Sequence, residues 1–65
     1  MTRSEASTLF QYQHLPEAIQ AVSKPFHDLA MKMFDDIPDE KGAYRTKALN
    51  ELWNAKNWAV AGVIQ

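Results

Sequence analysis

Two helical apolar patterns, separated by a short break, constrain this 65-residue chain most. In the first pattern, apolar residues recur every three or four positions at Leu15, Ile19, Val22, Phe26, Leu29, Met33 and Ile37. This spacing places them on one face of a helix. Pro16 suits the first helical turn, and Pro38 ends the helix because the residue before a proline avoids the α region. The sequence therefore predicts a helix over about residues 15–37, kinked at Pro25 because proline has no N–H to donate.

The second pattern predicts a helix over about residues 43–63, after a break formed by residues 39–42. Its stripe of mostly small residues consists of Ala48, Leu52, Ala55, Ala59 and Gly62. Leu49, Val60, Val63, Trp53, Ile64 and Trp58 widen this stripe to about twice the ~100° arc of an ordinary surface helix. A hairpin cannot cover so wide an arc, which favours packing between chains through Trp53, Trp58 and Phe34. The alternative is that these aromatic side chains cap the edges of the chain's own core.

The first thirteen residues are expected to form an N-terminal arm. Residues 1–8 are polar and predicted to be loose, whereas Leu9, Phe10 and Tyr12 are too apolar for a free tail. These three are expected in a short helix or in an arm laid on another protomer. The predicted fold class is therefore all-α: an antiparallel helical hairpin domain over residues 14–65 with an N-terminal arm (residues 1–13), assembled into a compact homo-oligomer.

Composition limits how so short a chain can be stabilised. Chains of this size usually add disulfides, a metal or oligomerisation to a small core. The chain has no cysteine and only two histidines, so oligomerisation remains. A net charge of −1 argues against a DNA or RNA duplex as partner. No apolar run approaches the ~20 residues of a membrane span, and no secretory signal is present, so a soluble cytoplasmic protein without a membrane partner is expected.

Arg45 and Lys56 are eleven residues apart and share one side of the second helix, inside its apolar arc. Charged groups are costly there unless they are paired. One interpretation is that their stems snorkel, or that they form salt bridges to an aspartate of the first helix, namely Asp28, Asp35 or Asp36. The other is that an oligomer places both cations around a small anionic ligand, with the Thr46 hydroxyl as a further donor.

Lys24 is a second candidate, because it precedes Pro25 and lies opposite the apolar face of its helix. It is either a solvated lysine or a phosphate contact, with Ser23 and His27 nearby. Tyr12, like Phe10 and His14, either stacks on a nucleobase or fixes the arm to the bundle.

Enzyme motifs are absent from the sequence, including GxSxG, HExxH and a phosphate-binding glycine loop. No enzymatic activity and no cofactor are therefore expected. The acidic group Asp35, Asp36, Asp39 and Glu40 is better explained as the end of one helix and the start of the next than as a metal site.

The stretches LPEAIQAVSKPFHDLA and RTKALNELWNAK resemble the helical hairpin domain of phage anti-CBASS sponge proteins, which also appears in a class of Thoeris anti-defence proteins. The resemblance covers roughly residues 14–61. It implies a homohexamer that sequesters cyclic dinucleotides and cyclic trinucleotides in separate pockets between protomers, in the host cell cytoplasm, without breaking a bond. The competing hypothesis is a small helical-bundle interaction protein that binds a partner helix through its exposed aromatic faces.

The resemblance also implies two sets of site residues. A tyrosine that covers a base matches Tyr12, and a phosphate-contacting cation before the PF pair matches Lys24. The candidate cyclic dinucleotide site is therefore Tyr12, Lys24, Phe26 and His27. The arginine and threonine that open the second helix match the pair at the trinucleotide site, so the candidate cyclic trinucleotide site is Arg45, Thr46, Leu49 and Lys56.

Overall fold

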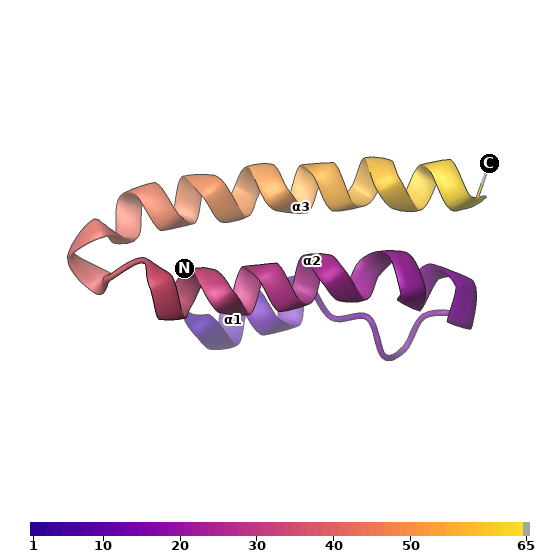
Figure 1. Cartoon of the computed structure of the whole chain (residues 1–65), viewed down its shortest axis with the longest axis horizontal. Helices are drawn as coiled ribbons and strands as arrows, with labels where there is room; N and C mark the ends of the chain where they lie inside the picture. Colours follow the sequence, from indigo (N-terminus) through magenta and orange to yellow (C-terminus); the bar gives the residue numbers. More distant parts are fainter. Residues whose placement is uncertain (65) are drawn as a thin grey trace.

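The computed structural model describes residues 1–64 of the chain and is all-α, as predicted. Its helices are α1 (Arg3–Leu9), α2 (Glu17–Asp36) and α3 (Gly42–Ile64), with a short 3-10 turn, η1 (Asp39–Lys41), between α2 and α3. α2 and α3 run antiparallel, and α1 packs against α2, below and behind it in the view of Figure 1. The molecule is elongated, with extents of 39 × 18 × 16 Å.

Both ends of α2 follow from prolines. Pro16 precedes the first helical residue, and the Gln20 side chain donates to the carbonyl of Leu15 at 2.7 Å just outside the helix. At the other end Ile37 is extended, as expected for a residue before a proline, and its N–H donates to the Met33 carbonyl. α2 continues through Pro25, which has no N–H for the carbonyl one turn earlier.

The prediction that residues 1–8 are loose is wrong. Thr2 Oγ1 accepts the Glu5 N–H at 3.1 Å, and the Thr2 N–H donates to the Glu5 carboxylate at 2.8 Å. This reciprocal capping box starts α1 and lowers the pKa of Glu5 through the hydrogen bond from the Thr2 backbone. A seven-residue helix is too short to persist in water alone, so α1 depends on its contact with α2. That contact buries Ala6 completely.

The core combines residues from all three helices and from the segment after α1. Its fully buried members are Ala6, Phe10, Ala30 and Leu49. Partly buried hydrophobic side chains surround them: Met1, Leu9, Phe26, Met31, Met33, Phe34 and Leu52. Because α2 packs against both α1 and α3, its buried face is wider than the predicted one.

The predicted apolar face of α2 is therefore partly wrong. Leu29, a member of that face, is 45% exposed. Ala30, next to it, is fully buried, and Met31 and Phe34, which lie off the predicted face, pack against the core. The rotation follows from α1, because a third helix on α2 moves the centre of the buried arc toward Met31 and Phe34.

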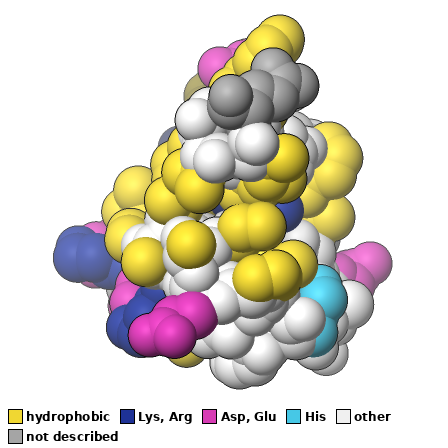
Figure 2. All heavy atoms as spheres, turned by 90° about the vertical axis from the view of Figure 1, so that its right-hand side faces the viewer, with side chains coloured by type: hydrophobic (Ala, Val, Ile, Leu, Met, Phe, Trp, Pro, Cys, Tyr) yellow, Lys and Arg dark blue, Asp and Glu magenta, His cyan; other side chains and the backbone are white. Residues whose placement is uncertain are grey.

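The core lies toward the turn between α2 and α3, and the opposite end of the hairpin is less covered. Large apolar side chains of α3 are exposed toward that end, namely Trp53, Trp58, Val63 and Ile64, and Tyr44 is exposed beside the turn. Figure 2 looks onto the end where α3 finishes and shows hydrophobic side chains over much of it, with charged groups mainly at the margins. Within residues 1–64, no helix is both long and apolar enough to cross a membrane.

Candidate functional site

Three of the four residues predicted for the cyclic dinucleotide site lie together. Tyr12 belongs to the connection between α1 and α2, which turns where the Leu15 N–H donates to the Tyr12 carbonyl at 3.0 Å. Its ring meets the His27 ring edge-on, with centroids 5.3 Å apart. Lys24 lies on α2 one turn before His27. The fourth residue, Phe26, instead packs against the core.

Asp28 forms hydrogen bonds with both basic side chains of this cluster, Lys24 and His27. Its Oδ2 lies 2.7 Å from Lys24 Nζ, and its Oδ1 lies 3.3 Å from His27 Nδ1. The hydrogen bond from Lys24, followed by that from His27, lowers the pKa of Asp28, and the same bond raises the pKa of Lys24. The carboxylate therefore offsets the lysine charge, and an anion that approaches Lys24 competes with it.

The sequence analysis missed this role of Asp28, although a signal was present. A lysine and an aspartate four residues apart on a helix are neighbours on its surface. The same spacing joins Lys32 to Asp36 further along α2. Ser23, expected near Lys24, is buried, and its hydroxyl has no hydrogen-bond partner within residues 1–64. The hydroxyl therefore lies inside the protein rather than beside the exposed ammonium of Lys24.

Arg45 is buried beside the turn between α2 and α3 and forms hydrogen bonds with it. Its Nη1 donates to the Ile37 carbonyl at 2.9 Å and to Asp39 Oδ1 at 3.1 Å. Its guanidinium carbon lies 4.3 Å from the centroid of the Phe34 ring, and only 8% of its side chain is exposed. Arg45 thus supplies a donor to a carbonyl at the C-terminal end of α2, where helical donors run out.

The predicted salt bridge from Arg45 to Asp28, Asp35 or Asp36 is therefore wrong. Arg45 lies in the first turns of α3, beside the connection, so its nearest carboxylate belongs to η1 rather than to α2. Asp35 instead pairs with Arg3 of α1 at 2.7 Å, and the Arg3 guanidinium also lies 5.3 Å from the Phe34 centroid. Two cations from different helices thus contact one aromatic ring.

The four residues predicted for the trinucleotide site do not form one open pocket within a single chain. Leu49 is fully buried, and Thr46 Oγ1 accepts a hydrogen bond from the Met1 nitrogen at 3.4 Å. Lys56 lies about 16 Å along the helix axis from Arg45, at the ~1.5 Å rise of each residue. Its ammonium group is 5.9 Å from the Trp53 ring centroid.

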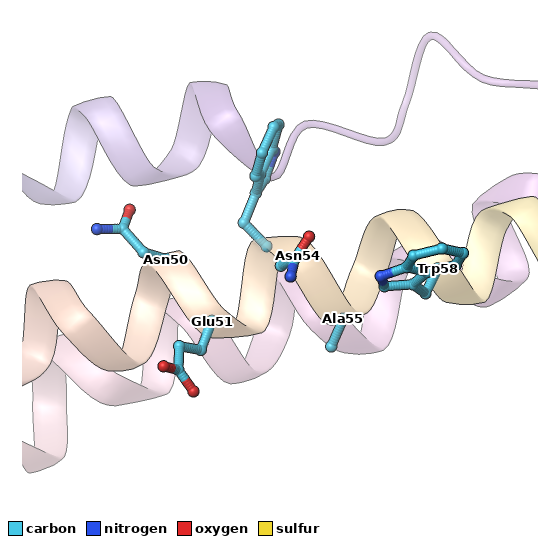
Figure 3. Close-up of a pocket in the computed structure, with 6 residues that line it drawn as sticks. Asn50, Glu51, Asn54, Ala55 and Trp58 are labelled. Carbon is cyan, nitrogen blue, oxygen red and sulfur yellow. The ribbon is translucent and has the colours of Figure 1, made fainter.

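A shallow hollow lies on the side of α3 that faces away from the core. Its lining residues all belong to α3: Asn50, Glu51, Trp53, Asn54, Ala55 and Trp58 (Figure 3). Two indole rings border it, and side-chain amides supply donors and acceptors, so the hollow suits a flat ring with polar edges. Among residues 1–64 no group of three or more histidine, aspartate or glutamate side chains is arranged to hold a metal.

No family model, no curated protein and no solved structure matches this chain.

Proposed function

We propose that this protein is a phage anti-defence sponge that binds cyclic di- and trinucleotide immune messengers and withholds them from CBASS effectors without cleaving them. One observation carries the proposal: the ring of Tyr12, in the connection before α2, meets the ring of His27 at 5.3 Å, and the exposed Lys24 lies one turn before His27 on α2. Aromatic rings stack on nucleobases, and an adjacent cation suits the phosphate that joins two of them.

The dinucleotide site works by exchange of anions. A ligand phosphate replaces the Asp28 carboxylate at Lys24, and a base stacks on the Tyr12 or His27 ring. Because all three side chains lie on one surface, a single chain covers only one side of a cyclic dinucleotide. A second protomer covers the other side in the homo-oligomer, which we take to be a hexamer.

The trinucleotide site is assigned to Arg45, Thr46, Leu49 and Lys56. Nη1 of Arg45 is occupied by Ile37 and Asp39, and Nε is buried, so Nη2 is the donor that is left for a phosphate. Leu49, one turn after Arg45 on α3, is fully buried, so its part in this site is to hold the helix in place rather than to touch the ligand. Lys56, three turns further along α3, meets such a ligand when protomers assemble.

Isothermal titration with cyclic di-GMP and cyclic tri-AMP tests the proposal, with chromatography of the released ligand afterwards. We expect Lys24→Glu to abolish dinucleotide binding and to leave trinucleotide binding intact. The substitution removes the phosphate contact and adds a repulsive charge. Lys32→Glu is the matched control, because Lys32 also pairs with an aspartate four residues ahead on the same helix. Equal losses in both variants, or a linear nucleotide among the products, would contradict the proposal.

A second candidate function is that of an interaction protein that binds a partner helix. The exposed aromatic side chains of α3 favour it, because Tyr44 and Trp58 are 74% and 75% exposed. Large exposed apolar patches commonly mark protein-binding surfaces. If neither cyclic nucleotide binds the wild-type protein, this candidate takes first place.

A further inference from the structure

The outward side of α3 carries a stripe with helical spacing that the chain itself leaves uncovered. The stripe consists of Tyr44, Lys47, Glu51, Ala55, Trp58 and Gly62, at steps of three or four residues. All six are exposed, and a side chain added at Gly62 would meet open space. The opposite side of α3 is the one that packs, since it holds the buried Arg45 and Leu49.

The two charged residues of this stripe, Lys47 and Glu51, are opposite in charge, so the stripe is complementary to the same stripe on a second copy. Lys47 and Glu51 lie one turn apart on α3, with Nζ and Oε1 3.7 Å apart, and both side chains are about three-quarters exposed or more. When two copies of α3 pack antiparallel, Lys47 of each copy can face Glu51 of the other. Opposite charges at facing positions of paired helices fix both orientation and register.

This register places the exposed aromatic side chain at the hollow. Tyr44 lies three residues before Lys47, and Asn54 lies three residues after Glu51, so Tyr44 of one copy faces Asn54 of the other. Asn54 lies within the hollow, between Trp53 and Trp58 in sequence (Figure 3). The same register brings Ala55 opposite Ala43, where two small side chains allow the helices to approach closely. The register set by the charges thus also places Tyr44 at the hollow.

We propose that α3 is a self-association surface, on which two copies of this chain pack antiparallel, with Lys47 facing Glu51 and Tyr44 filling the hollow of the other copy. The resulting dimer of hairpins is a helix bundle whose inner layer includes this stripe of α3 from both copies. This inference rests on the oligomer in the proposed function and identifies its interface, but it does not require a ligand.

Charge exchange tests the register directly. Sedimentation equilibrium at low salt is measured for the wild type, for Lys47→Glu, for Glu51→Lys and for the double variant K47E/E51K. Each single substitution turns two attractive facing pairs into two repulsive ones and should weaken self-association about tenfold. The double variant should recover the wild-type association, because every facing pair is again opposite in charge. Circular dichroism checks that all four proteins keep their helices.

A mixture of the wild type and the double variant tests the register more sharply. The double variant should not form mixed dimers with the wild type, because like charges then face each other at both positions. Native mass spectrometry of the mixture should therefore show no dimer that contains one copy of each protein. Statistical mixing, or a double variant that stays as weak as the single ones, would overturn the register.

The same samples separate this inference from the proposed function. If association responds to the charges as described and cyclic di-GMP does not bind, the surface stands and the sponge function fails. If cyclic di-GMP binds while association ignores both charges, the function stands and another face is the interface. Tyr44→Ala adds a check on the hollow, since it should weaken association and leave the charge dependence unchanged.

Discussion

Replacement of Arg45 by methionine should destabilise the fold, because the guanidinium is used inside the hairpin. Methionine keeps most of the apolar stem and loses the charge. The charged hydrogen bond to the Ile37 carbonyl is worth about 1.5–3 kcal/mol, and a desolvated contact with Phe34 about 1–2 kcal/mol. The pair with Asp39 adds little, because that carboxylate is 96% exposed. The substitution also removes the buried Nε–H group, which has no partner within residues 1–64, and this offsets part of the lost stability.

The expected net effect is a loss of about 2–3 kcal/mol, out of a total stability of roughly 3–10 kcal/mol for a chain of this length. Urea unfolding followed by far-ultraviolet circular dichroism measures it, at a protein concentration held fixed for all variants because association also adds stability. Arg3→Met is the matched control: Arg3 contacts the same Phe34 ring, but its side chain is 51% exposed. Its substitution should cost less than ~1 kcal/mol.

The result also bears on the trinucleotide site. If Arg45→Met unfolds at the wild-type urea concentration and loses only trinucleotide binding, the guanidinium serves the ligand and the structural reasoning is refuted. If stability falls as expected, loss of trinucleotide binding in this variant no longer identifies Arg45 as a ligand contact. Thr46→Val then becomes the informative substitution, since the one hydrogen bond of the Thr46 side chain in the described part of the chain is that from the Met1 nitrogen.

Three further predictions concern α2 and the segment after α1. Asp28→Asn should raise cyclic dinucleotide affinity about three- to tenfold, because the ligand no longer displaces a carboxylate from Lys24. Unchanged affinity in a calorimetric titration would show that Asp28 does not compete with the ligand for Lys24. Helicity should fall at both pH extremes. The contribution of the Asp28 carboxylate to stability is present above its ordinary pKa of 3.8 and is lost as pH falls through its lowered pKa in the folded protein. The contribution of the Lys24 ammonium is present below its ordinary pKa of 10.5 and is lost as pH rises through its raised pKa in the folded protein. Circular dichroism should show both declines reduced in Asp28→Asn. Phe10→Ala removes a fully buried ring and should lower the free energy of unfolding by about 3–5 kcal/mol in urea, whereas Leu9→Ala, at a half-buried position, should cost less.

The sequence predicted the hairpin well because its strongest signals are local. Pro16 and Pro38 bracket α2 within a residue or two, and the break before Gly42 bounds α3. The rotation of the α2 face could not be predicted in the same way, because it depends on α1 packing against the same helix. α1 itself had a local signal, the Thr2–Glu5 capping box, which is easily overlooked in a polar stretch.

The candidate site was predictable only where one helix determines it. Lys24 and His27 are one turn apart on α2, so their proximity follows from spacing. The contact of Tyr12 with His27 depends on how the connection after α1 folds back, which periodicity does not specify. The partner of Arg45 was mispredicted for a similar reason, since the path of η1 decides which carboxylate comes near.

A core placed toward the turn means that the two long helices are held unevenly along their length. Backbone amides near Leu49 exchange their hydrogens with solvent only when most of the molecule opens, whereas amides near the exposed end of α3 exchange through small local openings. Lys24 lies on α2 farther from the turn than the buried Ala30, on the more weakly held side. A ligand bound there would slow amide exchange most in the half of the hairpin that is least protected without it.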